Sequence, residues 1–178
     1  MELRQLRSDP VAWDILEERA RALMVQDTTA ESDQGEEFLA FRLDASSYSI
    51  PARFIREVQP LGDCTPLPHT PAFVAGLVNV RGRLIAVLDI RPLLDMPQTP
   101  FRSNAFLLIL SANGMDVGLL ADEVIEVRRS ADALMPVLST TADRAAAWVC
   151  GVDRNLNLVL DPLALLADPR LIVNGSSQ

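Results

Sequence analysis

Residues 73–91 read FVAGLVNVRGRLIAVLDIR, two apolar runs joined by the dipeptide Arg81-Gly82. Both runs are rich in valine, leucine and isoleucine, which are enriched in β-strands. A short polar connection that contains glycine, placed between two such runs, is typical of a β-hairpin. The segment therefore predicts strands at 77–80 and 84–89, joined by a tight turn.

A related segment, WVCGVDRNLNLVLD, occupies residues 148–161, and several other segments also occur twice in the chain. The pairs keep their order at an offset of roughly 70 to 75 residues: 48–50 with 117–119, 55–58 with 124–127, 73–77 with 148–152, and 84–94 with 156–166. Such repetition indicates two copies of one supersecondary unit. About five short strands in each copy suffice to close a small barrel. We therefore predict an all-β fold of two pseudo-symmetric barrels; chance matching of apolar patterns is the alternative, and the preserved order argues against it.

The ends of the chain differ in character from the repeated part. Residues 9–25 carry apolar side chains at helical spacing, with Asp9 at the N-cap position and Pro10 at the first helical position. Residues 26–36 are polar and acidic, as expected of a linker. We therefore predict three regions: an N-terminal helix and acidic linker at 1–36, a double-barrel domain at 37–167 that ends in a helical turn, and a C-terminal tail at 168–178.

The composition limits the classes of partner. The chain has 178 residues, a net charge of −8 and no lysine, so arginine supplies all of its positive charge. An acidic chain without a basic patch is a poor binder of nucleic acid, because phosphate neutralisation supplies most of that affinity. Cys64 and Cys150 lack metal-site spacing and are expected to be reduced, buried residues. With no signal-peptide pattern and no long apolar run, we expect a cytoplasmic protein.

The sequence offers little to support catalysis. His69 is the single histidine, in a proline-rich loop, and no glycine-rich phosphate-binding loop occurs. Asp89 and Asp161 could be read as a carboxylate pair. Each, however, follows an apolar strand and precedes a helical turn, so capping is the favoured interpretation. No metal-ligand spacing is present either, and we predict a chain that is no enzyme and holds no cofactor or metal.

The repeat itself separates scaffold residues from candidate functional ones. Gly76 recurs as Gly151, and Glu57 recurs as Glu126, so a structural role is expected for these positions. Arg81 has no counterpart, because the second copy has a shorter connection at this point. An arginine present in one copy only suggests a surface with a function, and an ordinary exposed turn residue is the alternative.

The same hairpin carries a family resemblance. Residues 73–82 and 84–91 resemble the CheW signature, F-[IV]-x-G-[IV]-x-N-[LI]-R-G followed by I-P-V-x-D-L-R. Segments 55–58, 66–68 and 117–127 are similar to the family as well, so the resemblance covers about residues 37 to 167. Ala86 stands where the family usually has proline, and residues 1–36 lie outside the pattern.

The resemblance to the CheW-like chemotaxis coupling proteins implies a fold and a function. The fold is two intertwined, five-stranded, SH3-like β-barrels. Family members are non-catalytic adaptors between a CheA-type histidine kinase and the cytoplasmic tips of methyl-accepting chemoreceptors, and they reach the membrane only indirectly, through those receptors. The family's receptor groove lies between the barrels, and the motif carries its protein-binding residues over to Ile55, Glu57, Gly76, Arg81, Phe106 and Val127. Among these, Glu57 and Arg81 are expected to form an ion pair at a partly exposed surface.

Two other functions remain open at the level of the sequence. One is a CheW-like adaptor of a specialised pilus or surface-motility system that binds only one of the two partners; the N-terminal extension favours it. The other is a small β-barrel ligand-binding protein or enzyme. That class needs a pocket with convergent polar groups, and the sequence reveals none.

Overall fold

The structure is a computed structural model, and it describes residues 35–97, 99–100, 102–137 and 146–171. The predicted N-terminal helix at 9–25 and the polar linker up to residue 34 lie outside the described residues. The described residues form ten strands: β1 (Glu36–Leu43), β2 (Ser46–Pro51), β3 (Ile55–Pro60), β4 (Val74–Val80), β5 (Arg83–Leu88), β6 (Phe106–Ala112), β7 (Met115–Ala121), β8 (Glu123–Ser130), β9 (Val149–Val152) and β10 (Leu158–Leu160). Between them lie the 3-10 turns η2 (Ala52–Phe54), η3 (Arg91–Leu94) and η4 (Ala146–Trp148), and the α-helix α2 (Pro162–Leu166) follows β10.

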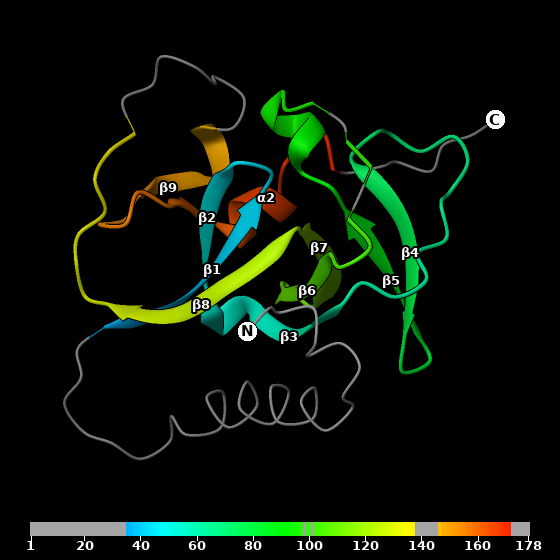
Figure 1. Ribbon diagram of the computed structural model, residues 1–178, viewed down its shortest axis with the longest axis horizontal. Coiled ribbons are helices and arrows are strands. Elements are labelled where there is room, and N and C mark those ends of the chain that lie inside the picture. The colour runs from blue at the N-terminus through cyan, green and yellow to red at the C-terminus, as the bar shows by residue number, and fades with distance from the viewer. Residues whose placement is uncertain (1–34, 98, 101, 138–145, 172–178) are drawn as a thin grey trace, which may run out of the picture. The chain divides into compact units, whose positions relative to one another are not determined.

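The strands form two five-stranded sheets of identical topology (Figure 1). One sheet, here called barrel A, has the order β8-β1-β2-β10-β9, and the other, barrel B, has the order β3-β6-β7-β5-β4. Shifting every strand number by five converts one order into the other, which confirms the predicted internal repeat. The all-β fold of two pseudo-symmetric, intertwined units is therefore confirmed.

The two copies exchange strands. Barrel A combines β1 and β2 of the first copy with β8, β9 and β10 of the second, and barrel B combines β6 and β7 with β3, β4 and β5. Neither copy closes a barrel alone, which corrects the simple expectation drawn from the strand count. In each barrel two pairings join the copies: a parallel one, β10 with β2 or β5 with β7, and an antiparallel one, β1 with β8 or β3 with β6. The pairings within a copy are antiparallel.

Each barrel is closed at a seam that contains a glycine. Thr65, after β3, bridges to Leu77 in β4, and Met135, after β8, bridges to Val152 in β9. Gly76 lies at the first seam with φ +151°, and a Cβ atom there would lie 2.3 Å from the carbonyl oxygen of Thr65. Gly151, at φ +157°, would bring its Cβ 2.7 Å from the oxygen of Met135. The scaffold role predicted for both glycines is confirmed.

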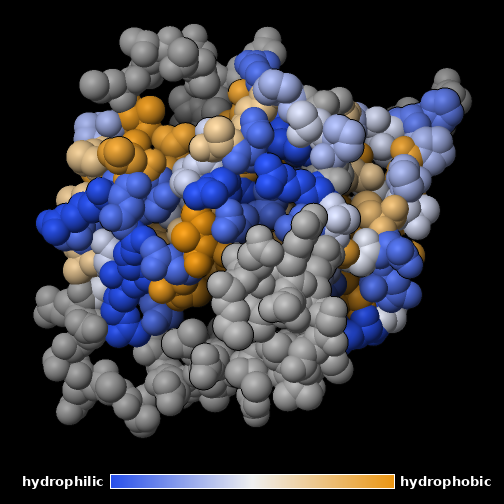
Figure 2. Space-filling model, in the orientation of Figure 1, coloured by the Kyte–Doolittle hydropathy of each residue, from blue (hydrophilic) through white to orange (hydrophobic). Residues whose placement is uncertain are grey.

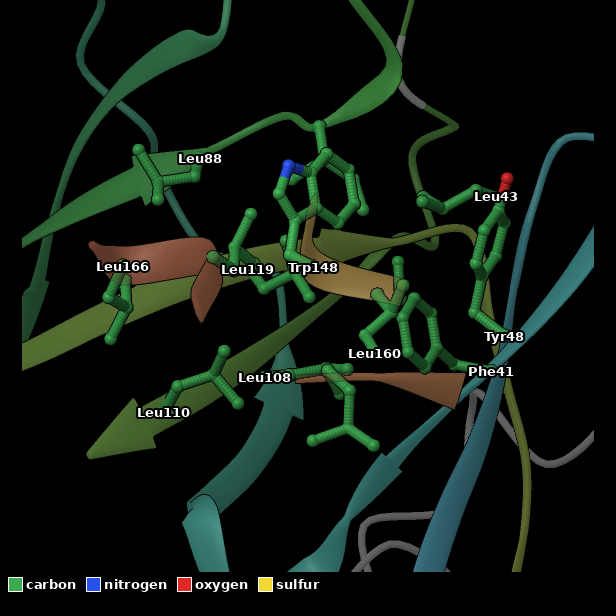
Figure 3. Packing of buried hydrophobic residues seen from close by; sticks show 14 of the residues in the cluster. Phe41, Leu43, Tyr48, Leu88, Leu108, Leu110, Leu119, Trp148, Leu160 and Leu166 are labelled. Carbon is green, nitrogen blue, oxygen red and sulfur yellow. The ribbon is translucent and has the colours of Figure 1, made fainter. Parts of the chain in front are cut away.

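The main apolar core joins the two barrels (Figure 3). Trp148 and Leu160 reach it from the second copy, and Phe41 reaches it from the first, each at most 1% exposed. The rings of Phe41 and Tyr48 stack with their centroids 5.8 Å apart. Burying one such side chain stabilises the fold by about 1.5–3 kcal/mol, so strand exchange gains much of its free energy in this cluster.

The two aspartates that follow β5 and β10 have related roles. Asp161 caps α2, because its side chain accepts hydrogen bonds from the backbone N–H groups of Leu163 and Ala164. The capping prediction is confirmed there. Asp89 forms a buried ion pair with Arg91, at 3.0 Å from Oδ1 to Nε, and the same Oδ1 accepts a hydrogen bond at 3.0 Å from the backbone N–H of Arg91, the first residue of η3. The capping prediction therefore holds at Asp89 as well, although Asp89 stands one residue before the N-cap position, Ile90, and the Arg91 side chain also contacts both carboxylate oxygens.

The chain stays packed beyond α2. Asp168 is 7% exposed and accepts hydrogen bonds from the indole Nε1 of Trp148 and from Arg170. Leu171 packs against the main core. Residues 168–171 of the expected tail are therefore part of the folded domain, and residues 172–178 lie outside the described part of the chain.

Candidate protein-binding site

The β4–β5 hairpin presents the candidate arginine. Arg81 and Gly82 occupy the turn with φ values of +51° and +82°, the combination of a type I′ turn, which matches the twist of the flanking strands. The side-chain oxygen of Asn79 accepts a hydrogen bond from the backbone N–H of Gly82 at 2.9 Å. The hairpin predicted from residues 77–89 is confirmed, and its turn holds the Arg81 side chain at the surface.

Glu57 and Arg81 meet across the seam between β3 and the hairpin. The guanidinium Nη2 of Arg81 lies 2.9 Å from Oε1 of Glu57, and the two side chains are 65% and 24% exposed. The expected pair at a partly exposed surface is therefore present. Such a pair contributes about 0–1 kcal/mol to stability, so its main effect is to orient the guanidinium.

A second ion cluster holds the same hairpin next to its turn, at Arg83. Asp116, at the start of β7, accepts hydrogen bonds or charge contacts from Arg56 at 2.7 Å and from Arg83 at 2.8 Å, and its side chain is only 8% exposed. A hydrogen bond from Ser111, together with the two arginines, holds the pKa of Asp116 below its usual range. Arg81 and Arg83 are thus each tied to a carboxylate, and the hairpin has a defined position on barrel B.

The other predicted site residues are dispersed. Ile55 is 7% exposed and belongs to the main core, and Gly76 is buried at the barrel seam, so neither offers side-chain surface to a partner. Phe106 is half-buried and pairs with Pro60, at the far end of the β3–β6 ladder from Ile55. Val127 is 42% exposed on β8 in barrel A. The structure brings Glu57 and Arg81 into contact, while Phe106 and Val127 expose apolar atoms on separate barrels.

Sequence reasoning missed the exposed leucine beside the arginine turn. Leu84 is 71% exposed, and Leu156, its counterpart in the second copy, is 75% exposed. Residues 84–88 are uniformly apolar in the sequence, whereas the structure turns Ile85 and Val87 into barrel B and Leu84 outward. Strand alternation is the signal that could have separated them. Figure 2 shows the wider context, a face on which hydrophilic residues predominate and apolar groups form small patches.

Barrel A also contains a cavity of about 150 Å³, which was not predicted from the sequence. Its lining comes from four strands and two loops that are distant in sequence: Phe38, Ala40, Ser49, Arg128, Arg129, Ser130, Asp132, Leu134, Asp153, Arg154, Asn155, Asn157 and Val159. Polar and charged side chains converge there with an apolar wall, which is the feature that a ligand-binding barrel requires.

The described residues contain no cluster of three or more histidine, cysteine or acidic side chains positioned to hold a metal ion. His69 is exposed in a turn, with φ +60°. Within the same part of the chain, no helix is both long and apolar enough to cross a membrane.

Comparisons with known proteins agree with this geometry. Protein FrzA of Myxococcus xanthus is 32% identical over 125 residues, which cover 69% of this chain and 77% of that protein. The chemotaxis protein CheW of Rhizobium meliloti is 27% identical over 119 residues, covering 66% and 77% of the two chains. The crystal structure of the scaffolding protein TtCheW from Thermoanaerobacter tengcongensis superimposes with a TM-score of 0.61 at 23% identity, covering 71% of this chain and 87% of that one, and it supports the fold.

The family comparison covers nearly the whole described domain. The sequence model of the CheW-like domain family matches residues 37–170, from the first residues of β1 to the Asp168–Arg170 pair after α2. This span holds both copies of the repeat, the glycine seams and the arginine hairpin. The chain therefore belongs to the CheW-like family of chemotaxis-type coupling adaptors.

Proposed function

We propose that this protein is a non-catalytic adaptor that couples a CheA-type histidine kinase to the cytoplasmic tips of chemoreceptors. The observation that carries the proposal is the Glu57–Arg81 pair on the β4–β5 hairpin, which the second copy does not repeat: its shorter β9–β10 connection has Arg154, which pairs with Asp132 and not with Glu126. A residue required only by the barrel scaffold would recur in both copies. Membership of the CheW-like family supports the same conclusion.

The hairpin supplies a suitable anchor for a helical partner. The Arg81 side chain is 65% exposed and held in one orientation by Glu57, so binding orders little additional side-chain structure. Arginine anchors surrounded by apolar contacts are frequent hot spots in protein interfaces. Phe106 and Val127 provide exposed apolar atoms that the apolar face of a receptor helix would contact.

The test is a binding titration of Arg81 variants against a fragment of the receptor signalling tip. Arg81→Ala should weaken binding at least tenfold, a loss of about 1.4 kcal/mol, while changing the melting temperature little, because an exposed pair contributes about 0–1 kcal/mol. Arg81→Lys should recover only part of the affinity, since lysine lacks the planar guanidinium fork. Arg42→Ala is the matched control, because it removes an exposed Arg–Glu pair at 2.9 Å, with Glu123, from barrel A.

Two outcomes would contradict the assignment of Arg81. One is wild-type binding by Arg81→Ala, and the other is a loss of binding that follows unfolding in the melts. The same preparation, incubated with the kinase and labelled ATP, should carry no stable phosphate; phosphate that stays on this chain would contradict the adaptor role.

A single-partner adaptor is the second candidate. Residues 1–34 precede the family match at 37–170, and an added segment could direct the chain to one partner only. Pull-downs with the kinase alone, the receptor fragment alone, and both together separate the candidates. Retention of only one partner would favour the single-partner adaptor.

A further inference from the structure

The two barrels share one topology, but the described residues fill their interiors differently. The corresponding volume of barrel B is filled by a second apolar cluster, made of Val78, Val80, Ile85, Val87, Leu107, Ile109 and Leu120. The strand registers pair the two sets of positions: Leu107 corresponds to Phe38, and Ile109 corresponds to Ala40. One barrel thus has a solid apolar interior, and the other has a lined cavity of about 150 Å³.

Three replacements account for the cavity. Ala40 stands where barrel B has Ile109, which removes three side-chain carbons from the barrel wall. The β9–β10 pair of barrel A corresponds to the β4–β5 pair of barrel B. When the two pairs are aligned by their registers, Asp153 corresponds to Val78 and Asn157 to Ile85. Close packing normally fills such a volume, because lost contacts are destabilising. Barrel A has instead kept room and has polar groups around it.

The inner wall of the cavity is a completed polar network. Asp153 accepts hydrogen bonds from Ser49 Oγ at 3.2 Å, from Asn157 Nδ2 at 2.9 Å and from the backbone N–H groups of Asn155 at 2.8 Å and Asn157 at 2.9 Å. Ser49 and Asn157 are 1% and 5% exposed. These four donors already satisfy the Asp153 carboxylate, so it shapes the cavity and is a poor site for an incoming cation.

The mouth of the cavity is rich in guanidinium groups. Arg128, Arg129 and Arg154 line it, and Asp132 is the one lining carboxylate besides Asp153. Arg128 pairs with Glu126 and lies against the amide of Asn155, Arg129 pairs with Glu37 at 2.9 Å, and Arg154 pairs with Asp132 at 2.9 Å. Their carboxylate partners are between 32% and 48% exposed, so solvent weakens these pairs and a competing anion can replace them.

We propose that the barrel A cavity binds a compact carboxylate carried on a small apolar or aromatic body. Guanidinium groups at the mouth would hold the carboxylate, since their planar fork matches its two oxygens. The apolar wall, formed by Phe38, Ala40, Leu134 and Val159, would contact the body of the ligand. A cavity of roughly 150 Å³ is large enough for a benzene ring. Such a ligand could be a free organic acid or the C-terminal residue of a peptide.

The experiment is an NMR titration of the ¹⁵N-labelled full-length chain with sodium benzoate at constant ionic strength. Saturable shifts should appear at backbone amides that line the cavity, in β1, β8 and the β9–β10 turn. Benzamide, which has the same shape without the charge, should bind at least tenfold more weakly. The second arm of the experiment titrates N-acetyl-glycyl-phenylalanine and its C-terminal amide. If the dipeptide with the free carboxylate binds more tightly than benzoate, the natural ligand is the C-terminus of a peptide. If only benzoate binds, the natural ligand is a free organic acid.

Two variants place barrel B residues into barrel A. Ala40→Ile should fill the cavity and abolish saturation. Arg128→Gln introduces the residue found at the corresponding position, Gln59, and should weaken benzoate binding at least tenfold. Arg42→Gln removes a paired arginine of the same barrel that does not line the cavity, and it should bind benzoate as wild type does. Arg128 is at the surface, so its variant tests the proposal even where Ala40→Ile fails to fold.

Three results would overturn the inference: no saturable shifts with benzoate, equal binding of benzoate and benzamide, or unchanged binding by Arg128→Gln. The inference does not depend on the receptor-coupling proposal. Arg81→Ala should bind benzoate normally, so failure of one proposal leaves the other to be judged by its own titration.

Discussion

At the scale of single residues, buried charged side chains stabilise this protein through the hydrogen bonds and ion pairs that they form. Asp168 shows this most clearly, because its carboxylate accepts hydrogen bonds from Arg170 and from the buried indole of Trp148. The hydrogen bond from Arg170, with the charge of that side chain, lowers the pKa of Asp168 to about 2. The native state therefore favours the ionised form of a residue that links the C-terminal segment to the core.

The lowered pKa predicts a pH dependence of stability. Because the pKa of Asp168 is lower in the native state than in the unfolded chain, its ionised carboxylate stabilises the fold. This contribution to the free energy of unfolding is complete above about pH 4 and is lost as the pH falls toward 2. Asp168→Asn should lower the free energy of unfolding by about 1–2 kcal/mol at pH 7 and flatten its decline between pH 4 and 2. Urea unfolding at several pH values measures both effects. Asp63→Asn, at an exposed loop residue, is the control and should keep the wild-type profile.

At the scale of elements, the two glycine seams close the barrels in the same way. Gly76 and Gly151 both adopt positive φ, and each lies against the backbone of the segment that bridges to it. The clash expected for a Cβ atom is closer at Gly76, 2.3 Å from Thr65, than at Gly151, 2.7 Å from Met135. The seams therefore depend on glycine for both conformation and space.

Alanine at these seams should be destabilising. Gly76→Ala is expected to lower the free energy of unfolding by about 1–3 kcal/mol, through a strained backbone and displacement of Thr65, and Gly151→Ala by a similar or smaller amount. Gly62→Ala is the matched control, because no atom lies within 4 Å of its added Cβ. Thermal melts rank the three variants. A Gly76→Ala variant as stable as Gly62→Ala would show that the seam can open without cost.

At the scale of the whole molecule, the fold is built within residues 35–171. Among the described residues, both sheets and the main core lie in this range, and β1 begins at Glu36. Removing residues 1–34 should therefore leave the domain folded and lower the melting temperature by only a few degrees, since about 1 kcal/mol corresponds to roughly 2–4 °C at this size. Circular dichroism melts of the full and shortened chains make the comparison. Loss of the cooperative transition after truncation would show that the N-terminal segment is part of the fold.

Much of the architecture follows from the sequence alone. The repeated segments specify two equivalent units, and the dipeptide Arg81-Gly82 specifies a hairpin, because two adjacent positive φ values select the turn type locally. Recurrence of Gly76 as Gly151 marks scaffold positions, since both copies face the same steric constraint. The pairing of Glu57 with Arg81 came from the family resemblance, and it agrees with the structure.

Only the tertiary structure decided which strands are neighbours and which side chains remain accessible. Apolar periodicity shows that a strand has a buried face, but it does not identify the strand opposite, so the exchange of strands between copies was not visible in the pattern. The burial of Ile55, which pairs with Leu110 of the second copy, depends on that exchange. The barrel A cavity has the same origin: small and polar residues far apart in sequence surround one volume only after the two copies have interlocked.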